Sequence, residues 1–296
     1  MLFTIFTPTY NRKDELHNVY QSIVKQGSTD LEWVIMDDGS NDGTKEIVED
    51  WMQEDKIRIK YYSQPNQGRF AAYNNAIQYF DGDLVLLLDS DNVLLDGALQ
   101  NLSEAWGEYD TSTVSGIISY MVDADGKIYG TGFPEGIETE RIYTLYDKYG
   151  ISGDKTLAFR RDLVVKYRYP TFENEKFGGD AYVFNKMNDE LPMLLLRKKI
   201  IGHGVGEDSI TNNLLNYHLK SPNGMREHYR DTLEHEKYNK KNMIKHAIGY
   251  VAYSIMTGRG IGRTIASSPK KVLTTLMYPA GVLFYLRCNR LKESME

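Results

Sequence analysis

The sequence predicts an α/β fold, in which helices flank a mostly parallel sheet and a helical extension follows at the C-terminal end. Two observations carry this prediction. Apolar strand-like runs alternate with helical periodicity through the first hundred residues, as is typical of βαβ units. From about Met243 the periodicity is helical again. With 296 residues, 41% of them hydrophobic, the chain can bury a sizeable core.

Strands and helices alternate in the first hundred residues. The first strand is predicted at residues 2–8, and the helix after it repeats apolar residues at helical spacing from Leu16 to Val24. Further strands are predicted at 32–37, 56–62 and 84–88. Between them, helices carry Ile47, Val48 and Trp51, and then Tyr73, Ala76, Ile77 and Phe80. In such an alternation the carboxyl ends of the parallel strands lie along one edge of the sheet.

The pattern changes beyond residue 110. Short alternating segments at 115–122 and 127–132 predict antiparallel strands and loops rather than further βαβ units. A broad apolar helical face begins at Met243, and a second helix is expected from near Pro269, with a kink at Pro279.

Charge is distributed unevenly along the chain. The net charge is −6, yet the stretch from Lys237 to Lys292 holds eleven Lys or Arg and no Asp or Glu. The rest of the chain then holds 24 basic and 41 acidic residues, a net of −17. The basic stretch suits an anionic membrane surface, and packing of its helices on the core or against a second copy in a homodimer is the alternative. The acidity of the remainder argues against nucleic acid as a partner.

The single cysteine, Cys288, cannot form an internal disulfide, which fits a reducing compartment and excludes a cysteine-based metal cluster. We see no secretory signal before the first strand and no run of about eighteen apolar residues that would span a membrane. We therefore expect a cytoplasmic protein, with peripheral contact at the cytoplasmic face of the membrane through residues 236–296.

Carboxylates follow two of the predicted strands. Asp38 lies after the second strand, and Asp89 and Asp91 lie after the fourth. On an extended chain, side chains two apart point the same way, so Asp89 and Asp91 would converge. A bound divalent cation, Mg²⁺ or Mn²⁺, would relieve their repulsion and take oxygen ligands. The alternative is an acidic turn that caps a helix beginning near Leu95.

Four motifs occur together in one order: "TIFTPTYNR", "WVIMDDGSNDGT", "NQGRFAAYNNAI" and "LVLLLDSDN". They resemble the nucleotide-sugar domain of family 2 glycosyltransferases. "SGDKTLAFRRDLVVKYRYPTFENEKFGGD", "GEDSITNN" and "SPNGM" resemble later segments of bacterial members that build surface polysaccharides. The resemblance implies a GT-A-like fold. Residues 1–110 would form the nucleotide-sugar-binding half, 111–235 the acceptor-binding half, and 236–296 a basic amphipathic helical tail.

The resemblance also implies roles for individual residues. Asp38 would hydrogen-bond the base. Asp37 would either hydrogen-bond the ribose or support the turn after the second strand. Asp91 is the expected metal ligand, with Asp89 on the metal, its water or the ribose. Tyr73 stands where many relatives carry arginine, which places a phosphate role there in doubt. The implied nucleotide-sugar site as a whole is Thr7, Pro8, Tyr10, Asp37, Asp38, Gly68, Arg69, Asn74, Asp89 and Ser90.

Asp180 in "FGGDAYVF" matches the family's base position, with Glu175 as the runner-up and a helix N-cap as the alternative for Asp180. Deprotonation of the acceptor hydroxyl by such a base contributes a rate factor of about 10²–10⁴, and direct displacement inverts the anomeric centre. His203 is either a further metal ligand or a satisfied loop histidine. Lys155, Arg160 and Arg161 either reach phosphates or form a solvated surface.

These observations favour a metal-dependent, inverting and non-processive glycosyltransferase that moves a sugar from a nucleotide diphosphate sugar, UDP-linked, to a saccharide or lipid-linked saccharide acceptor. The Gln-x-x-Arg-Trp motif of processive relatives does not occur. A sugar nucleotidyltransferase is an alternative, although its glycine-rich first loop is missing from "TPTYNRKDEL". A non-catalytic carbohydrate-binding scaffold is another.

Overall fold

The computed structural model describes residues 1–203, 214–234 and 239–293. These residues form two compact units, each with its own packing. The first unit contains Met1–Arg168 and Asn185–Glu207, and the second contains Tyr169–Phe184 and Asp208–Glu296. The segment "GEDSITNN", at residues 206–213, lies outside the described residues.

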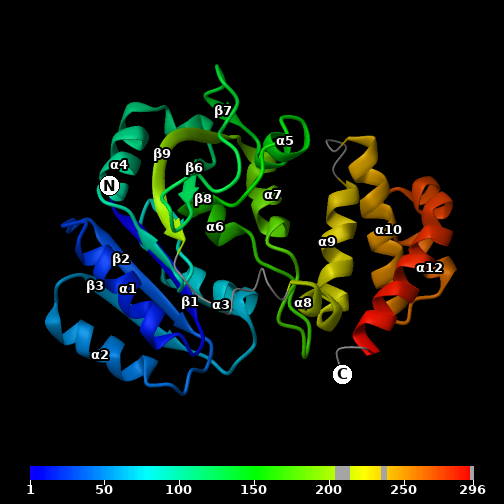
Figure 1. The fold of residues 1–296 in the computed structure, drawn as a ribbon, viewed down its shortest axis with the longest axis horizontal. Helices are drawn as coiled ribbons and strands as arrows, with labels where there is room; N and C mark the ends of the chain where they lie inside the picture. The colour runs from blue at the N-terminus through cyan, green and yellow to red at the C-terminus, as the bar shows by residue number, and fades with distance from the viewer. Residues whose placement is uncertain (204–213, 235–238, 294–296) are drawn as a thin grey trace. The chain divides into compact units, whose positions relative to one another are not determined.

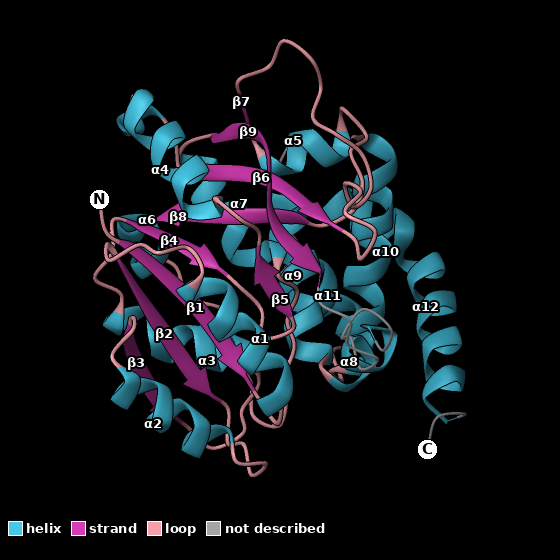
Figure 2. Ribbon diagram, turned by 60° about the vertical axis from the view of Figure 1, so that its left-hand side comes forward, coloured by secondary structure: helices cyan, strands magenta, loops and turns pink. Residues whose placement is uncertain are grey.

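The first unit is built on a nine-stranded mixed sheet, in which β7 pairs with β9 beside the main strand order β3-β2-β1-β4-β8-β6-β9-β5 (Figures 1 and 2). The first βαβ elements are β1 (Phe3–Thr9), α1 (Lys13–Val24), β2 (Leu31–Asp37), α2 (Thr44–Glu54), β3 (Arg58–Ser63), α3 (Arg69–Ala76), the 3₁₀ turn Ile77–Tyr79 and β4 (Leu84–Leu87). Next come β5 (Asn92–Leu94), α4 (Ala98–Glu108), β6 (Gly116–Val122), β7 (Thr139–Glu140), α5 (Ile142–Asp147), β8 (Lys155–Arg160), α6 (Arg161–Lys166), α7 (Ala181–Glu190) and β9 (Met193–His203).

Strands β3, β2, β1 and β4 run parallel, as the alternation predicts. Successive side chains of a strand point to opposite faces, and the packing follows this rule. On one face Trp33 of β2 packs under α1 and α2, where the rings of Tyr20 and Trp51 stack with centroids 4.4 Å apart. On the other face Phe6 of β1 meets Tyr73 of α3 edge to face. Both faces of the parallel strands are therefore covered by helices. Polar groups of these strands can meet a ligand only at the strand ends.

The later strands confirm the predicted change of pattern. Strand β8 is antiparallel to both β4 and β6, and β9 is antiparallel to β5 and β7, while β6 and β9 run parallel. The strand predicted at 127–132 is wrong, because only Ile128 forms a bridge, to Val122. The third helix ends at Ala76 in a 3₁₀ turn instead of reaching Phe80.

The second unit contains a bundle of helices: α8 (Leu214–Lys220), α9 (Pro222–Glu234), α10 (Lys240–Met256), α11 (Ile261–Ala266) and α12 (Lys271–Glu293). Helix α10 packs against both α9 and α12 (Figure 1). Glycines allow the close approaches, since a Cβ on Gly281 of α12 would lie 2.4 Å from Val251 of α10. A single helix runs through Pro279. Among the described residues, the structure contains no helix with the length and apolarity needed to cross a membrane.

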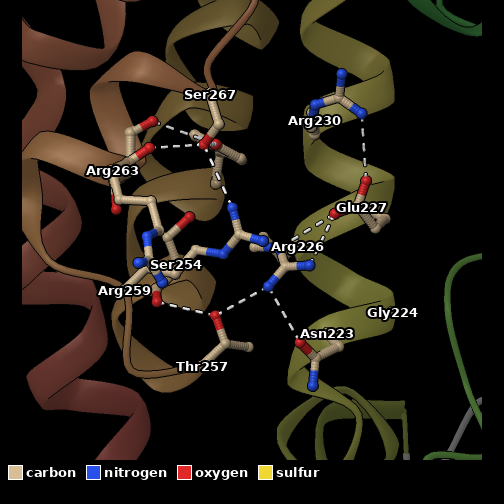
Figure 3. A network of polar contacts seen from close by, with 12 residues as sticks. Asn223, Gly224, Arg226, Glu227, Arg230, Ser254, Thr257, Arg259, Arg263 and Ser267 are labelled. Carbon is tan, nitrogen blue, oxygen red and sulfur yellow. Dashed lines mark hydrogen bonds and ion pairs between the residues drawn. The ribbon is translucent and has the colours of Figure 1, made fainter. Parts of the chain in front are cut away.

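A buried arginine ties α9 to the end of α10 (Figure 3). Arg226 is 6% exposed and donates to Asn223 Oδ1 at 3.0 Å and to Thr257 Oγ1 at 3.1 Å. Its guanidinium also forms an ion pair with Glu227 at 2.8 Å. Arg259 donates in turn to Ser267 after α11. A buried charge is tolerated only when it is paired and hydrogen-bonded. The contacts of Arg226 meet this condition and join α9 to the end of α10, and the Arg259 bond joins the following loop to the end of α11.

A second buried group, His228 of α9, lies against the backbone at Gly179. A Cβ at position 179 would lie 2.6 Å from His228 Nδ1, and Gly179 has φ +84°. Among the residues that the structure describes, His228 Nδ1 has no hydrogen-bond partner. Burial, followed by the nearby His246, lowers the pKa of His228 from 6.5 to about 4, against the opposing effect of Asp231. The imidazole is therefore held neutral inside the second unit.

We expect His228 to make the stability of the protein depend on pH. Between its folded pKa of about 4 and its unfolded value of 6.5, the unfolded state binds more protons, so the free energy of unfolding falls as the pH drops through this window. The full effect is about 3 kcal/mol. Urea unfolding of the wild type and of His228→Leu at neutral and mildly acidic pH measures it, with the exposed His17→Leu as control. Equal pH slopes in the wild type and His228→Leu would contradict this expectation.

Candidate active site

The candidate site lies at the carboxyl ends of β1, β2 and β4, where the strand order reverses between β1 and β4. Ligands of open α/β sheets bind at such a point. The loop after β1 is fastened to the loop after β2 by three hydrogen bonds, from Asn11 N to Ser40 Oγ, from Asn41 N to Asn11 Oδ1 and from Lys13 N to Asp42 Oδ2. Arg12 sits in the middle of this fastened loop and is thereby held in place.

The paired carboxylates after β4 each face an arginine. Asp91 Oδ2 accepts from Arg12 Nη1 at 2.8 Å, and both side chains are less than one fifth exposed. Asp89 Oδ1 lies 3.3 Å from Arg69 Nη2, and the Asp89 side chain is 48% exposed. The extended geometry expected for Asp89 and Asp91 is wrong, because the chain turns at Ser90 and Asp91 and Asn92 N donates to the carbonyl of Asp89 at 3.1 Å. The two carboxylates therefore occupy different surroundings.

Asp37 and Asp38, adjacent at the end of β2, hold different parts of the site. Asp37 Oδ1 accepts from Ser40 N, and its Oδ2 accepts from Tyr61 Oη at 2.5 Å. Burial, and then the bond to Asp37, raise the pKa of the Tyr61 hydroxyl, which therefore stays protonated and donates. Asp37 thus supports the turn, which is one of its two expected roles.

Asp38 holds the loop that leads into α3. Its Oδ1 accepts from Gln64 Nε2 at 2.7 Å and from Gln67 N at 2.8 Å, and its Oδ2 accepts from Gly68 N at 2.7 Å. Gly68 has φ +91° and ψ 162°, a conformation that is essentially restricted to glycine. The loop in turn sets the position of Arg69 at the first position of α3, so one buried carboxylate places the arginine that faces Asp89.

Other predicted nucleotide-site residues differ in how accessible they are. Thr7 is fully buried and its hydroxyl accepts from Trp33 Nε1 at 2.9 Å, so only its backbone can face a ligand. Pro8 is half-buried, Tyr10 is 46% exposed and Ser90 is 7% exposed. Asn74 is half-buried and its carbonyl accepts from Arg168. Tyr73 is in the core, with its hydroxyl donating to the carbonyl of Val164.

The two candidate bases lie in the second unit. Asp180 is half-buried in the turn before α7, and its carbonyl accepts from Tyr169 Oη at 3.0 Å. Glu175 caps α9: its carboxylate accepts from Asn223 N and Nδ2 and from Gly224 N at 2.8 Å. These three hydrogen bonds commit the Glu175 carboxylate to the N-terminus of α9. The assignment of Asp180 as base stays a prediction.

Four further basic residues contact other groups of the protein. His203, the last residue of β9, has its Nδ1 3.1 Å from Asn92 Oδ1, which matches a satisfied loop histidine. Lys155 is 8% exposed and its Nζ donates to the carbonyls of Tyr129, Ser152 and Gly153, so neither a phosphate role nor a solvated position fits it. Arg160 pairs with Asp162, and Arg161 donates to the carbonyl of Phe80.

The side chains at the strand ends include oxygen donors of the kind that divalent cations bind. Among the described residues, no three His, Cys, Asp or Glu side chains gather into a group that would hold a metal. Two carboxylates, Asp89 and Asp91, do lie at the strand ends beside guanidinium groups suited to phosphate. Mg²⁺ sites commonly use one or two carboxylates and complete their coordination with water and substrate phosphates. The donor set fits a cation that arrives with a diphosphate.

Arg12 was not among the residues predicted from sequence. Its position could have identified it as a site residue, because it follows β1 by three residues and β1 pairs with β4 in the sheet. A basic residue after one of two adjacent parallel strands lies at the same edge of the sheet as a carboxylate after the other. This reasoning would have paired Arg12 with Asp89 or Asp91.

We expect Asp38→Asn to loosen the loop at residues 64–68. One of the three donors would then face an amide N–H₂ group instead of a carboxylate oxygen, which costs about 1–3 kcal/mol of unfolding free energy. Binding of UDP or GDP should weaken with it, as isothermal titration calorimetry measures. Asp96→Asn, at a side chain 76% exposed, is the matched control. Unchanged stability and unchanged nucleotide binding in Asp38→Asn would show that Asp38 does not organise the loop.

The chain is similar in sequence to known proteins. The family model described as Glycosyl transferase family 2 matches residues 4–168. GalNAc(5)-diNAcBac-PP-undecaprenol beta-1,3-glucosyltransferase of Campylobacter jejuni subsp. jejuni serotype O:2 is 29% identical over 211 residues, which cover 70% of this chain and 66% of that protein. Glycosyltransferase GlyG of Streptococcus pneumoniae serotype 4 is 30% identical over 129 residues, 43% of this chain and 42% of that protein. The chain thus spans less than two thirds of the length of these relatives.

Solved structures resemble the whole chain. S. aureus TarS 1-349 in complex with UDP-GlcNAc has a TM-score of 0.66 and 17% identity, covering 100% of this chain and 93% of that one. Mannosyltransferase PcManGT from Pyrobaculum calidifontis, in complex with GDP-Man and Mn²⁺, has a TM-score of 0.55 and 16% identity, covering 96% and 86%. These likenesses confirm the predicted GT-A-like fold with its helical C-terminal part. Because the family model spans more than half of the sequence, and its motifs fall on the strand ends that form the candidate site, the chain belongs to glycosyl transferase family 2.

Proposed function

We propose that this protein is an inverting, metal-dependent glycosyltransferase that moves a sugar from a nucleotide diphosphate sugar, UDP-linked, to a hydroxyl of a saccharide acceptor. The observation that carries the proposal is the arrangement at the ends of β1 and β4, where Asp89 and Asp91 each face a guanidinium. Carboxylates that bind a cation and arginines that bind phosphate are both needed to hold a nucleoside diphosphate. Functionally, residues 1–110 would bind the donor and 111–235 the acceptor.

The nucleoside would bind along the ends of β1 and β2. The exposed ring of Tyr10 and the half-buried Pro8 offer apolar contact, and the backbone of Thr7 lies beside them. Asp38 would present the loop at Gly68 to the base, because a glycine with positive φ lets backbone approach a ligand closely. Asn74 and Ser90 would contribute polar atoms from α3 and from the turn after β4.

The diphosphate would displace the internal ion pairs. In their paired state, Arg12 and Arg69 neutralise Asp91 and Asp89. A diphosphate offers these arginines a bidentate anionic partner, which frees the carboxylate oxygens for Mn²⁺ or Mg²⁺. When bound, the cation supplies stabilisation of the negative charge that develops on the departing nucleoside diphosphate. The arginines hold the same oxygens from the protein side.

The transfer itself needs a base on the acceptor side. The acceptor oxygen would attack the anomeric carbon as the bond from that carbon to the phosphate oxygen breaks, with the hydroxyl proton passing to Asp180. Attack opposite the leaving group inverts the anomeric centre. The choice of Asp180 over Glu175 is supported by the three hydrogen bonds that commit the Glu175 carboxylate to α9.

The acceptor we propose is a saccharide, free or lipid-linked, of the kind used in surface polysaccharide biosynthesis at the cytoplasmic face of the membrane. Support comes from the Campylobacter relative, which is named as a glucosyltransferase of GalNAc(5)-diNAcBac-PP-undecaprenol. The UDP donor is supported by the UDP-GlcNAc complex of TarS, while GDP-Man in the PcManGT complex makes a guanine nucleotide the first alternative to test.

We expect Asp91→Asn to weaken donor binding mainly when Mn²⁺ is present. Removing the charge leaves Arg12 in place for phosphate but deletes a cation ligand, so the metal-dependent gain in nucleotide affinity should fall by on the order of tenfold or more. Calorimetry with UDP and with GDP, each with and without Mn²⁺, measures this gain. Asp96→Asn is the control for a surface carboxylate. An undiminished Mn²⁺ effect in Asp91→Asn would remove this residue from the metal site.

A product assay separates the proposed reaction from the alternatives. Release of a nucleoside diphosphate from a sugar nucleotide supports the transferase. Pyrophosphate-dependent formation of a sugar phosphate would identify a sugar nucleotidyltransferase. No reaction with any donor, despite measured binding, would identify a non-catalytic carbohydrate-binding protein.

We expect Asp180→Asn to spare donor binding while transfer falls by about 10²–10⁴-fold, the usual contribution of a general base. Glu175→Gln is the matched comparison: it should lower the free energy of unfolding by about 1 kcal/mol, because the cap of α9 weakens, and leave transfer in the folded protein nearly unchanged. The measurements are donor affinity, transfer rate and urea unfolding for each variant. Loss of donor binding in Asp180→Asn, or loss of transfer only in Glu175→Gln, would reject the assignment.

A further inference from the structure

Helix α12 carries a stripe of exposed apolar side chains. Val272 is 76% exposed, Leu276 66%, Leu283 68% and Leu286 48%. Their spacings of four, seven and three residues keep them on one side of the helix, and the exposed Pro279 lies between them. Single exposed apolar residues are ordinary, but a row along four turns of one helix marks a surface that binds something apolar.

The stripe lies opposite the face of α12 that packs on the bundle. Thr274, Gly281 and Cys288 are buried on the inner face. Leu276 and Leu283 follow Thr274 and Gly281 by two residues, which is about 200° around a helix. Helix α12 is therefore apolar on its outer side as well as packed on its inner side, whereas an ordinary surface helix is polar outside.

Basic residues surround the stripe. Lys271 precedes it, and the exposed Arg287, Arg290 and Lys292 follow its last leucine. From Asn239 to Lys292 the sequence has ten Lys or Arg and no Asp or Glu. A second copy of the chain would bring a surface of the same sign against this one, and like charges oppose such contact. The partner that matches both properties is apolar and negatively charged.

We propose that the outer face of α12 binds the surface of an anionic lipid bilayer. The helix would lie in the plane of the interface, with Val272, Leu276, Leu283 and Leu286 entering the boundary between headgroups and acyl chains. Arg287, Arg290 and Lys271 would lie among anionic headgroups, where each basic residue adds about fivefold to the partition coefficient. This inference uses no residue of the candidate active site, so it stands or falls independently of the proposed transfer reaction.

Such binding would deepen the proposed function. A lipid-linked saccharide is confined to the bilayer, so an enzyme held at the same surface meets its acceptor in two dimensions. The same surface contact would serve an acceptor whose lipid stays in the membrane while its sugar is extended.

The test is co-sedimentation of the full chain with vesicles of phosphatidylglycerol and phosphatidylcholine, compared with vesicles of phosphatidylcholine alone. We expect binding to the anionic vesicles, weakened by salt, since surface charges are screened. The double variant Leu276→Glu/Leu283→Glu should reduce partitioning by on the order of a hundredfold, because each leucine loses its burial. The double variant Arg287→Gln/Arg290→Gln should reduce it by about 25-fold on anionic vesicles only.

Two controls separate the causes. Thr275→Glu adds a negative charge at an exposed position of the same helix without removing an apolar side chain, so it should bind more strongly than the double leucine variant. Met52→Glu changes an exposed apolar residue of α2 and should bind like the wild type. Circular dichroism and donor binding verify that each variant is folded.

The proposal is overturned if the wild type does not sediment with anionic vesicles, or if folded Leu276→Glu/Leu283→Glu sediments equally well. It is also overturned if the wild type is a dimer in sedimentation velocity that this variant converts to a monomer, without any vesicle binding by the wild type. In that case α12 forms an interface between two copies.

Discussion

The candidate site depends on charge balance at the end of a buried strand. Strand β4 is apolar, and the segment that follows it carries two carboxylates, Asp89 and Asp91, whose charges would repel one another if left unpaired. The structure resolves this by placing a guanidinium against each, with Arg12 supplied by the loop after β1 and Arg69 by the start of α3. In the proposed function, a diphosphate would replace the carboxylates as the partner of these arginines, and a cation would bind the carboxylates. A site built in this way is stable before its ligand arrives and has the charges in place when the ligand comes.

The placement of those arginines depends on structure further back in the chain. Arg12 is fixed because its loop is hydrogen-bonded to the loop after β2, and Arg69 is fixed because Asp38 holds the segment before α3. Asp37, the neighbour of Asp38, points to Ser40 and Tyr61 instead. The two adjacent carboxylates therefore have separate structural roles, and Asp38 acts by positioning the loop that leads to Arg69.

Much of this could be predicted from sequence, because the parallel strands and their helices follow periodicity and the four motifs fall on the strand ends. The failures have identifiable causes. Asp89 and Asp91 were expected on an extended chain, but a turn at Ser90 separates their surroundings and leads into a short strand, β5. Periodicity does not register a three-residue strand. Lys155 was expected either to reach a phosphate or to lie in solvent, yet its ammonium donates to backbone carbonyl groups of two loops whose shape no local pattern reveals. Arg12 was missed because only pairing between distant strands brings it to Asp91.

The contact between Gly179 and His228 has a consequence for how this sequence can vary. The imidazole occupies the volume that any side chain at position 179 would need. A change at either position is therefore constrained by the other: a larger residue at 179 demands a smaller one at 228 as well as a backbone that abandons positive φ. Substitutions at these two positions, 49 residues apart in the sequence, should therefore occur together. The same constraint limits how the segment next to Asp180 can vary.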